Sequence, residues 1–208
     1  MIEQGTHEWK MLRLGKISAS RINDILAKGR DGGPSATREN YKYDLAIERL
    51  TGVPTESFTS SAMAWGVENE SMARGAYEAA KGVFVSEVPW IPHPTIANAG
   101  CSPDGLVDDG KGLVEIKCPL SKTHVEYIMG QVPPKTYYNQ IMWQLAVTGR
   151  EYNDFVSYDP RMPLDLELFI IRVQRDEKYI EMLTDEVIKF DAEVTQTVNK
   201  LKELKNGS

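Results

Sequence analysis

CSPDGLVDDGKGLVEIKCP, residues 101–119, is the stretch on which the expected fold of this chain depends. It contains two apolar runs, 105–107 and 112–116, which are separated by Asp108-Asp109-Gly110. An Asp-Gly pair between such runs is a strong signal for a hairpin. The sequence therefore predicts two paired strands.

Three charged side chains are expected to meet on this hairpin. Asp104 precedes the first strand, while Glu115 and Lys117 lie two residues apart on the second. Side chains two residues apart on a strand point to the same face. Apolar residues alternate with these charges, which indicates a buried strand, where a charged group is costly unless it is paired or bound to metal.

Two interpretations of these charges remain open on the residues alone. Asp104 can be a turn residue, with Glu115 and Lys117 as an exposed pair, because a Glu-x-Lys match by itself has little specificity. Alternatively, the two carboxylates can hold a hard cation such as Mg²⁺ while Lys117 holds the attacking water. The upstream Pro103 and the buried pattern favour the second interpretation.

Composition limits the remaining choices. A chain of 208 residues with 41% hydrophobic content can bury a substantial core, so we expect one domain over residues 1–208. The first residues do not resemble a signal peptide, and no apolar run approaches a membrane span, so we expect a cytoplasmic protein with no membrane partner. Two cysteines and three histidines fit no zinc spacing, and the net charge of −6 argues mildly against nonspecific coating of nucleic acid.

Periodicity predicts helices in the first part of the chain and the sheet after them. Helices are expected at 18–28, 37–50, 62–81, 121–129, 137–147 and 176–205, and strands at 83–88, 105–107, 112–116, 154–158 and 166–173. The fold class is therefore α/β (α+β), with a mixed central sheet, an N-terminal helical part and a long C-terminal helix over one sheet face. Glu70 and Arg74, spaced i,i+4, are expected from periodicity to form an ordinary exposed ion pair.

Six blocks of the chain together resemble a known family. Pro103-Asp104 followed by Glu115-x-Lys117 resembles the PD-(D/E)xK nuclease signature. The sequence around these residues is similar to lambda exonuclease and other phage-type alkaline exonucleases of the YqaJ-like kind. The blocks lie at 12–15 with 17–20, at 64–66 with 70 and 73–74, and at 101–105, 115–119, 158–162 and 175–179. Several separated blocks in one order are more specific than any single block.

The resemblance implies a restriction-endonuclease-like core and a Mg²⁺-dependent 5′-to-3′ exonuclease acting on linear double-stranded DNA ends. Such an enzyme releases 5′-mononucleotides and leaves a 3′ overhang for a single-strand annealing protein. The resemblance also implies a ring-shaped homotrimer, encoded by a phage or prophage and acting in the bacterial cytoplasm.

The resemblance assigns the metal site to the hairpin and to one earlier helix. Asp104, Glu115, the Ile116 carbonyl and Glu70 would hold Mg²⁺, with Mn²⁺ as a substitute and two ions per active site when substrate is bound. Lys117 would serve the attacking water.

A helical glutamine is the next site residue that the resemblance implies. Gln140 matches a family glutamine near the active site. The family has a second glutamine two residues later, where this chain has Met142, while Gln144 comes four residues later. Which of Gln140 and Gln144 serves the site is therefore open.

The remaining implied residues contact DNA. Arg13 and Ser20 match positions that receive the terminal 5′ phosphate, although without the resemblance they are a surface residue and a helix cap. Met63 matches an apolar residue that wedges apart the end base pair, and a core role at the start of its helix is the alternative. Lys122 or His124 takes the place of a displaced basic residue that contacts phosphate.

Two other functions stay open. A site-specific endonuclease would cut circular DNA and would need side chains that read bases, of which none is identifiable. A catalytically silent module that binds DNA ends would act without metal, and the intact Asp104, Glu115 and Lys117 argue against it.

Overall fold

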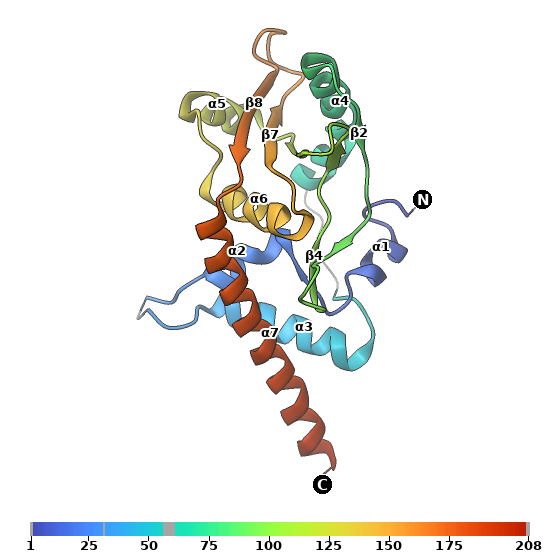
Figure 1. The fold of residues 1–208 in the computed structure, drawn as a ribbon, viewed down its shortest axis with the longest axis vertical. Helices are drawn as coiled ribbons and strands as arrows, with labels where there is room; N and C mark the ends of the chain where they lie inside the picture. Colours follow the sequence, from blue (N-terminus) through green and yellow to red (C-terminus); the bar gives the residue numbers. More distant parts are fainter. Residues whose placement is uncertain (1, 31, 56–60, 207–208) are drawn as a thin grey trace.

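The computed structural model of the chain describes residues 2–30, 32–55 and 61–206. Figure 1 shows the larger sheet at one end of the molecule, with helix α4 (Ser61–Lys81) on one side of it and α6 (Lys135–Thr148) on the other. Helix α7 (Glu177–Asn206) starts after the sheet, runs along α3 (Ala36–Thr51) and carries the C-terminus far from the sheet. The predicted mixed α/β fold with a long C-terminal helix is confirmed. The expectation that this helix covers a sheet face is wrong, because α6 covers that face and α7 packs mainly on α3, α6 and α2 (Ile22–Leu26).

The larger sheet has five strands in the order β2-β5-β6-β7-β8. Strands β6 and β7 are parallel, and the other neighbouring pairs are antiparallel. A parallel pair needs a long crossover, which α5 and α6 provide. The bounds are β2 Val85–Ser86, β5 Gly105–Val107, β6 Gly112–Lys117, α5 Ser121–Gly130, α6 Lys135–Thr148, β7 Tyr152–Tyr158 and β8 Leu168–Gln174.

A second, three-stranded sheet corrects the expectation that the sheet begins only after the N-terminal helices. Its order is β1-β4-β3, with β1 at Ile17–Ser18, β3 at Ile91–Pro92 and β4 at Ala99–Cys101. Strand β1 pairs in parallel with β4, far away in the sequence. A strand of two residues is too short to show a period of two, so its pattern merged with that of the helix after it.

The remaining elements are helical. Helix α3 begins after Ser35, whose side chain accepts from the Arg38 N–H, and ends at Gly52 with a φ of 70°. The predicted helix at 18–28 is shorter than expected, because β1 and a 3₁₀ turn take its first residues. The bounds are α1 His7–Leu12, η1 Ala19–Arg21, α2 Ile22–Leu26, α3 Ala36–Thr51, α4 Ser61–Lys81 and α7 Glu177–Asn206.

The predicted hairpin forms between β5 and β6. Gly110 adopts a φ of 75° in its loop, a conformation that side chains other than glycine rarely adopt. The Asp109 carboxylate accepts the N–H groups of Lys111 and Gly112 at 2.7 and 2.9 Å, which fixes the loop. Gly105 is needed at the other end, because a Cβ there would lie 2.0 Å from Val85 Cγ1 of the neighbouring strand β2.

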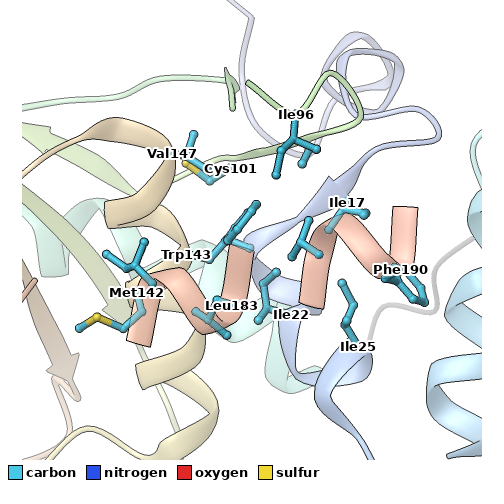
Figure 2. Packing of buried hydrophobic residues seen from close by; sticks show 14 of the residues in the cluster. Ile17, Ile22, Ile25, Ile96, Cys101, Met142, Trp143, Val147, Leu183 and Phe190 are labelled. Carbon is cyan, nitrogen blue, oxygen red and sulfur yellow. The ribbon is translucent and has the colours of Figure 1, made fainter. Parts of the chain in front are cut away.

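Two apolar clusters cover the two faces of the larger sheet. On one face, Ala73 and Tyr77 of α4 pack against Val114, Ile116 and Val156. The larger cluster lies on the other face, and Figure 2 shows Trp143 of α6 close to residues of α2 and α7 within it. Strand β6 is therefore buried on both faces, which explains its nearly continuous apolar run.

Two ion pairs link α3 to α7. Arg38 donates to both carboxylate oxygens of Glu193, at 2.5 and 2.9 Å, and also to the Ile25 carbonyl at 3.1 Å. Arg49 donates to Asp191 at 2.6 Å. These contacts tie the long helix to the N-terminal helices. Within the described residues, no helix is long and apolar enough to cross a membrane.

Candidate active site

Asp104 directly precedes strand β5, next to Gly105, the first residue of β5 that pairs with β6. Its Oδ2 accepts the backbone N–H of Ile116 at 2.7 Å, two residues beyond Val114, which pairs with Gly105. The carboxylate therefore replaces a strand partner and is held against the edge of β6. Its position depends on the hairpin register, which the sequence predicted.

Glu115 and Lys117 point to the α6 face of β6, as the period of two predicts. The Lys117 ammonium lies 2.5 Å from Glu115 Oε1 and 3.7 Å from Asp104 Oδ2, and it donates to the Ile116 carbonyl at 2.9 Å. The Glu115 side chain has no exposed surface. The structure thus confirms the prediction that two carboxylates and an ammonium lie close together on this hairpin.

Burial and charge act on these groups in opposite directions. Burial, together with the charge of Asp104, raises the pKa of Glu115 to about 7, although Lys117 and a glutamine partner act against this rise. Burial alone lowers the pKa of Lys117, but the carboxylates of Glu115 and Asp104 outweigh burial and raise it. Lys117 is therefore charged, and it supplies the positive charge between the two acids.

Both candidate glutamines reach Glu115. Gln140 Nε2 donates to Glu115 Oε1 at 2.5 Å, and Gln144 Nε2 donates to Glu115 Oε2 at 2.6 Å. The two residues lie one turn apart on α6, so their side chains share one helix face. Each glutamine therefore contacts one carboxylate oxygen of Glu115, and which of them serves the reaction stays a prediction.

Glu70 approaches the same place from α4. It forms the expected i,i+4 pair with Arg74 at 3.2 Å, yet burial and the charge of Asp104 raise its pKa. Glu70 also lines a cavity of about 410 Å³. The other residues that line this cavity are Gly66, Val67, Ile116, Lys117, Cys118, Pro119 and Tyr137. Glu70 is therefore a neighbour of the hairpin acids as well as an ion-pair partner.

The oxygen atoms around Lys117 match the ligands of a hard cation. Glu115, Asp104 and the Ile116 carbonyl all approach its ammonium, so a positive charge already occupies the centre of this donor set. Mg²⁺ commonly takes one or two carboxylates and keeps several waters. Among the described residues, no group of three acidic, histidine or cysteine side chains forms a metal cage. The donors fit a water-rich ion and do not form a closed cage.

A second candidate site lies between the N-terminal segment and α3. Its cavity of about 300 Å³ is lined by Arg13, and the Arg13 guanidinium stacks over the Trp9 ring at 3.9 Å. Burial lowers the pKa of Arg13. Ser20 is exposed, and its hydroxyl lies 3.3 Å from that of Ser18, which lines the cavity. The structure thus brings the two predicted phosphate residues to one region.

Sequence reasoning missed further charged residues of this cavity. Lys10, Lys16 and Arg21 also line it, and so do the acids Asp44 and Glu48. Lys16 lies between the two parts of the first block of the family resemblance, 12–15 and 17–20, and Arg21 directly follows that block. Their positions next to Arg13 and Ser20 were the signal that could have identified them.

The three other residues predicted to contact DNA are His124, Lys122 and Met63, and they differ in how far their side chains are exposed or described. His124 is fully buried, with Nδ1 2.6 Å from the Ser157 hydroxyl and Nε2 2.8 Å from the Leu166 carbonyl. The prediction that His124 contacts phosphate is therefore wrong, because the packing of α5 on the sheet takes up both ring nitrogens. Lys122 is exposed on the first turn of α5. Met63 belongs to α4, but its side chain lies outside the described residues.

Known proteins resemble this chain in both sequence and structure. The family model described as YqaJ-like viral recombinase domain matches residues 8–151. The crystal structure of an alkaline exonuclease, LHK-Exo from Laribacter hongkongensis, is 43% identical, covers 97% of this chain and 99% of its own, and has a TM-score of 0.90. A crystal structure of LHK-Exo in complex with dAMP is 44% identical over 97% of this chain and 99% of its own, also with a TM-score of 0.90.

A more distant structure shares the fold alone. A phage related exonuclease from Haemophilus somnus 129PT is 15% identical, covers 89% of this chain and 96% of its own, and has a TM-score of 0.71. The comparison with curated proteins gives no match.

Proposed function

The chain belongs to the family of YqaJ-like viral recombinase domains, and we propose that it is a metal-dependent exonuclease that degrades the 5′-ended strand of linear duplex DNA. The observation that carries the proposal is the meeting of Asp104, Glu115 and the Ile116 carbonyl around one positive charge. The alkaline exonuclease with 43% identity supports the reaction class. We further propose that residues 1–208 act as a single exonuclease domain.

We propose Mg²⁺ as the cofactor, with Mn²⁺ as a substitute and two ions when substrate is bound. Asp104, Glu115 and the Ile116 carbonyl would hold it, and Glu70 would contact it or its waters. When bound, the metal would neutralise charge on the scissile phosphate and lower the pKa of the attacking water.

The side chains around the metal ligands have separate tasks in this proposal. Lys117 keeps its proton, because its pKa is raised, and it can therefore donate to a water or to a phosphate oxygen. Gln140 and Gln144 restrain one oxygen each of Glu115. Tyr137, whose ring lies 5.4 Å from the Lys117 ammonium, forms one wall of the cavity beside it.

The Arg13 cavity would determine which strand is cut. A guanidinium that is already partly dehydrated binds a terminal phosphate with charge-assisted hydrogen bonds. Ser20 would add a hydroxyl donor, and Lys16 would add a second positive charge to the same cavity. Met63 as the wedge at the end base pair and Lys122 as a phosphate contact complete the proposed DNA path.

The product of this reaction fits a recombination role. Removal of 5′-mononucleotides leaves a 3′ overhang, which a single-strand annealing protein can bind. The similar LHK-Exo structure in complex with dAMP supports the release of mononucleotides. We also propose a homotrimer, encoded by a phage or prophage and acting in the bacterial cytoplasm.

One experiment separates this function from the two alternatives. Linear duplexes labelled at their 5′ ends, and circular duplexes without nicks, are incubated with the protein in Mg²⁺ or in EDTA. The proposal expects release of labelled mononucleotides from the linear DNA in Mg²⁺ only. Cutting of the circle would indicate an endonuclease, and binding of ends without release would indicate a silent module.

A further inference from the structure

Gln144 is held at its far end by a residue of the sheet. Asn153 Nδ2 donates to Gln144 Oε1 at 2.8 Å, while Gln144 Nε2 donates to Glu115 Oε2 at 2.6 Å. Asn153 pairs with Leu113 in the parallel register of β6 and β7, and therefore shares the sheet face of Glu115. Two hydrogen bonds thus connect Asn153, through one amide, to the carboxylate of the site.

Of the two polar groups of the Asn153 amide, only the NH₂ group forms a hydrogen bond among the described residues. All three residues of this chain of hydrogen bonds are fully buried. The Asn153 carbonyl oxygen Oδ1 is buried and has no hydrogen-bond partner among the described residues. An unpaired buried acceptor costs stability, whereas an apolar side chain of similar shape would avoid that cost. The interaction that Asn153 gains in return is its hydrogen bond to Gln144.

The direction of the Gln144 amide depends on this donor. A glutamine amide has an oxygen on one side and an NH₂ group on the other, and rotation by about 180° exchanges them. With Asn153 donating, Gln144 turns its oxygen towards β7 and its NH₂ towards Glu115. Rotation would place two acceptors, Gln144 Oε1 and Glu115 Oε2, against each other, and would place two NH₂ groups against each other at Asn153.

The Glu115 carboxylate is consequently fixed at both oxygens. Gln140 and Lys117 contact Oε1, and Gln144 contacts Oε2. Groups that orient metal ligands in this way usually change metal affinity or activity by about 10- to 100-fold when they are removed.

We propose that Asn153 is a positioning residue, which acts through Gln144 to hold the Glu115 carboxylate in its metal-binding orientation. This inference rests on the proposed metal-dependent function. It adds to the site a residue that touches neither DNA nor metal.

The test is a double-mutant cycle with Mn²⁺ as the probe. Wild type, Asn153→Leu, Gln144→Met and the double variant are titrated with MnCl₂ by calorimetry, and nucleotide release is measured alongside. Asn153→Leu should weaken Mn²⁺ binding by about 10-fold. In the Gln144→Met background it should have no further effect, which a general loss of packing would not produce.

Tyr77→Phe provides the matched control. It removes a different buried hydrogen bond to β7, from the Tyr77 hydroxyl to Asp154 at 2.9 Å on the opposite sheet face. It should lower the melting temperature while leaving Mn²⁺ affinity unchanged. Equal effects of Tyr77→Phe and Asn153→Leu on Mn²⁺ binding would overturn the inference.

Other outcomes are equally decisive. Mn²⁺ affinity that stays at the wild-type value in Asn153→Leu, or additive losses in the double variant, would exclude action through Gln144. If Asn153→Leu does not fold, Asn153→Val takes its place. Unchanged Mn²⁺ affinity in the single variant Gln144→Met would show that Gln144 does not link Asn153 to the metal site. A wild type that binds no Mn²⁺ would instead contradict the proposed function itself.

Discussion

Trp9 donates its indole N–H to the hydroxyl of Ser102 at 3.1 Å, and Ser102 lies two residues before Asp104. The same N–H also donates to the Pro89 carbonyl at 2.7 Å. Because the guanidinium of Arg13 stacks over the ring of the same Trp9, this side chain contacts both the Arg13 cavity and the segment that leads into the hairpin. A terminal phosphate bound at Arg13 would therefore be held at a defined place relative to the hairpin acids.

Arg13→Ala should remove the preference for 5′-phosphorylated ends. Loss of a charge-assisted contact predicts a fall of about 10- to 100-fold in kcat/KM on phosphorylated duplexes, because such hydrogen bonds contribute about 1.5–3 kcal/mol. On duplexes with 5′-hydroxyl ends the rate should stay unchanged. Lys189→Ala, which removes an exposed cation of α7, serves as the control and should affect neither substrate. A variant of Arg13 that still distinguishes the two kinds of end would exclude this role.

The pH dependence of stability should report the raised pKa of Glu115. The folded value is about 7, against an ordinary value of 4.5, so between these values the folded protein binds a proton that the unfolded chain has lost. In metal-free buffer, this group therefore makes the free energy of unfolding fall as pH rises from 4.5 to about 7.

Glu115→Gln isolates that contribution. Denaturant unfolding of wild type and variant in EDTA, over the same pH range, gives the difference between their free energies of unfolding. The wild type should lose stability relative to the variant as pH increases. A constant difference would show that Glu115 does not titrate in this range in the folded protein.

Arg38→Leu should destabilise the protein by about 1–3 kcal/mol, because it leaves the Ile25 carbonyl and the Glu193 carboxylate without their donor. Arg38 also lowers the pKa of Glu193, so this pair stabilises the fold above the ordinary pKa of a glutamate and less as pH falls below it. Urea unfolding at about pH 7 and about pH 4 measures both effects. Lys189→Met removes an exposed pair on the same helix and should have no measurable effect.

The proposed trimer predicts a mass in solution of three times the 23.4 kDa of the chain. Light scattering coupled to size exclusion measures that mass directly. A monomer at micromolar concentration would contradict the ring, although it would leave the assignment of the hydrolytic residues intact.

Local rules were sufficient for the hairpin and for most helices. Asp109-Gly110 predicted the turn, and the period of two placed Glu115 and Lys117 on one face of the strand. These features depend on neighbouring residues, which a sequence shows directly. The ion pair predicted between Glu70 and Arg74 forms, but it is half-buried and not exposed as expected, because α4 packs on the sheet and brings Glu70 near Asp104.

The remaining features depend on contacts between distant segments. Strand β1 exists only because Ile17 and Ser18 pair with Ala99 and Gly100. The burial of His124 follows from the packing of α5, which no local pattern determines. Asn153 lies one residue before the strand expected at 154–158, so the local pattern did not place it in the buried strand β7 or identify Gln144 as its partner.

The most direct test of the proposed hydrolytic site is the Mg²⁺-dependent rate of nucleotide release by Asp104→Asn. The asparagine keeps the size of the side chain and can still accept the Ile116 N–H, so the hairpin should fold, as circular dichroism would verify. We expect at least about a 100-fold loss of the rate on 5′-phosphorylated linear duplex, because one of the two hairpin carboxylates is removed. Release at the wild-type rate by a correctly folded Asp104→Asn would contradict the assignment of this site.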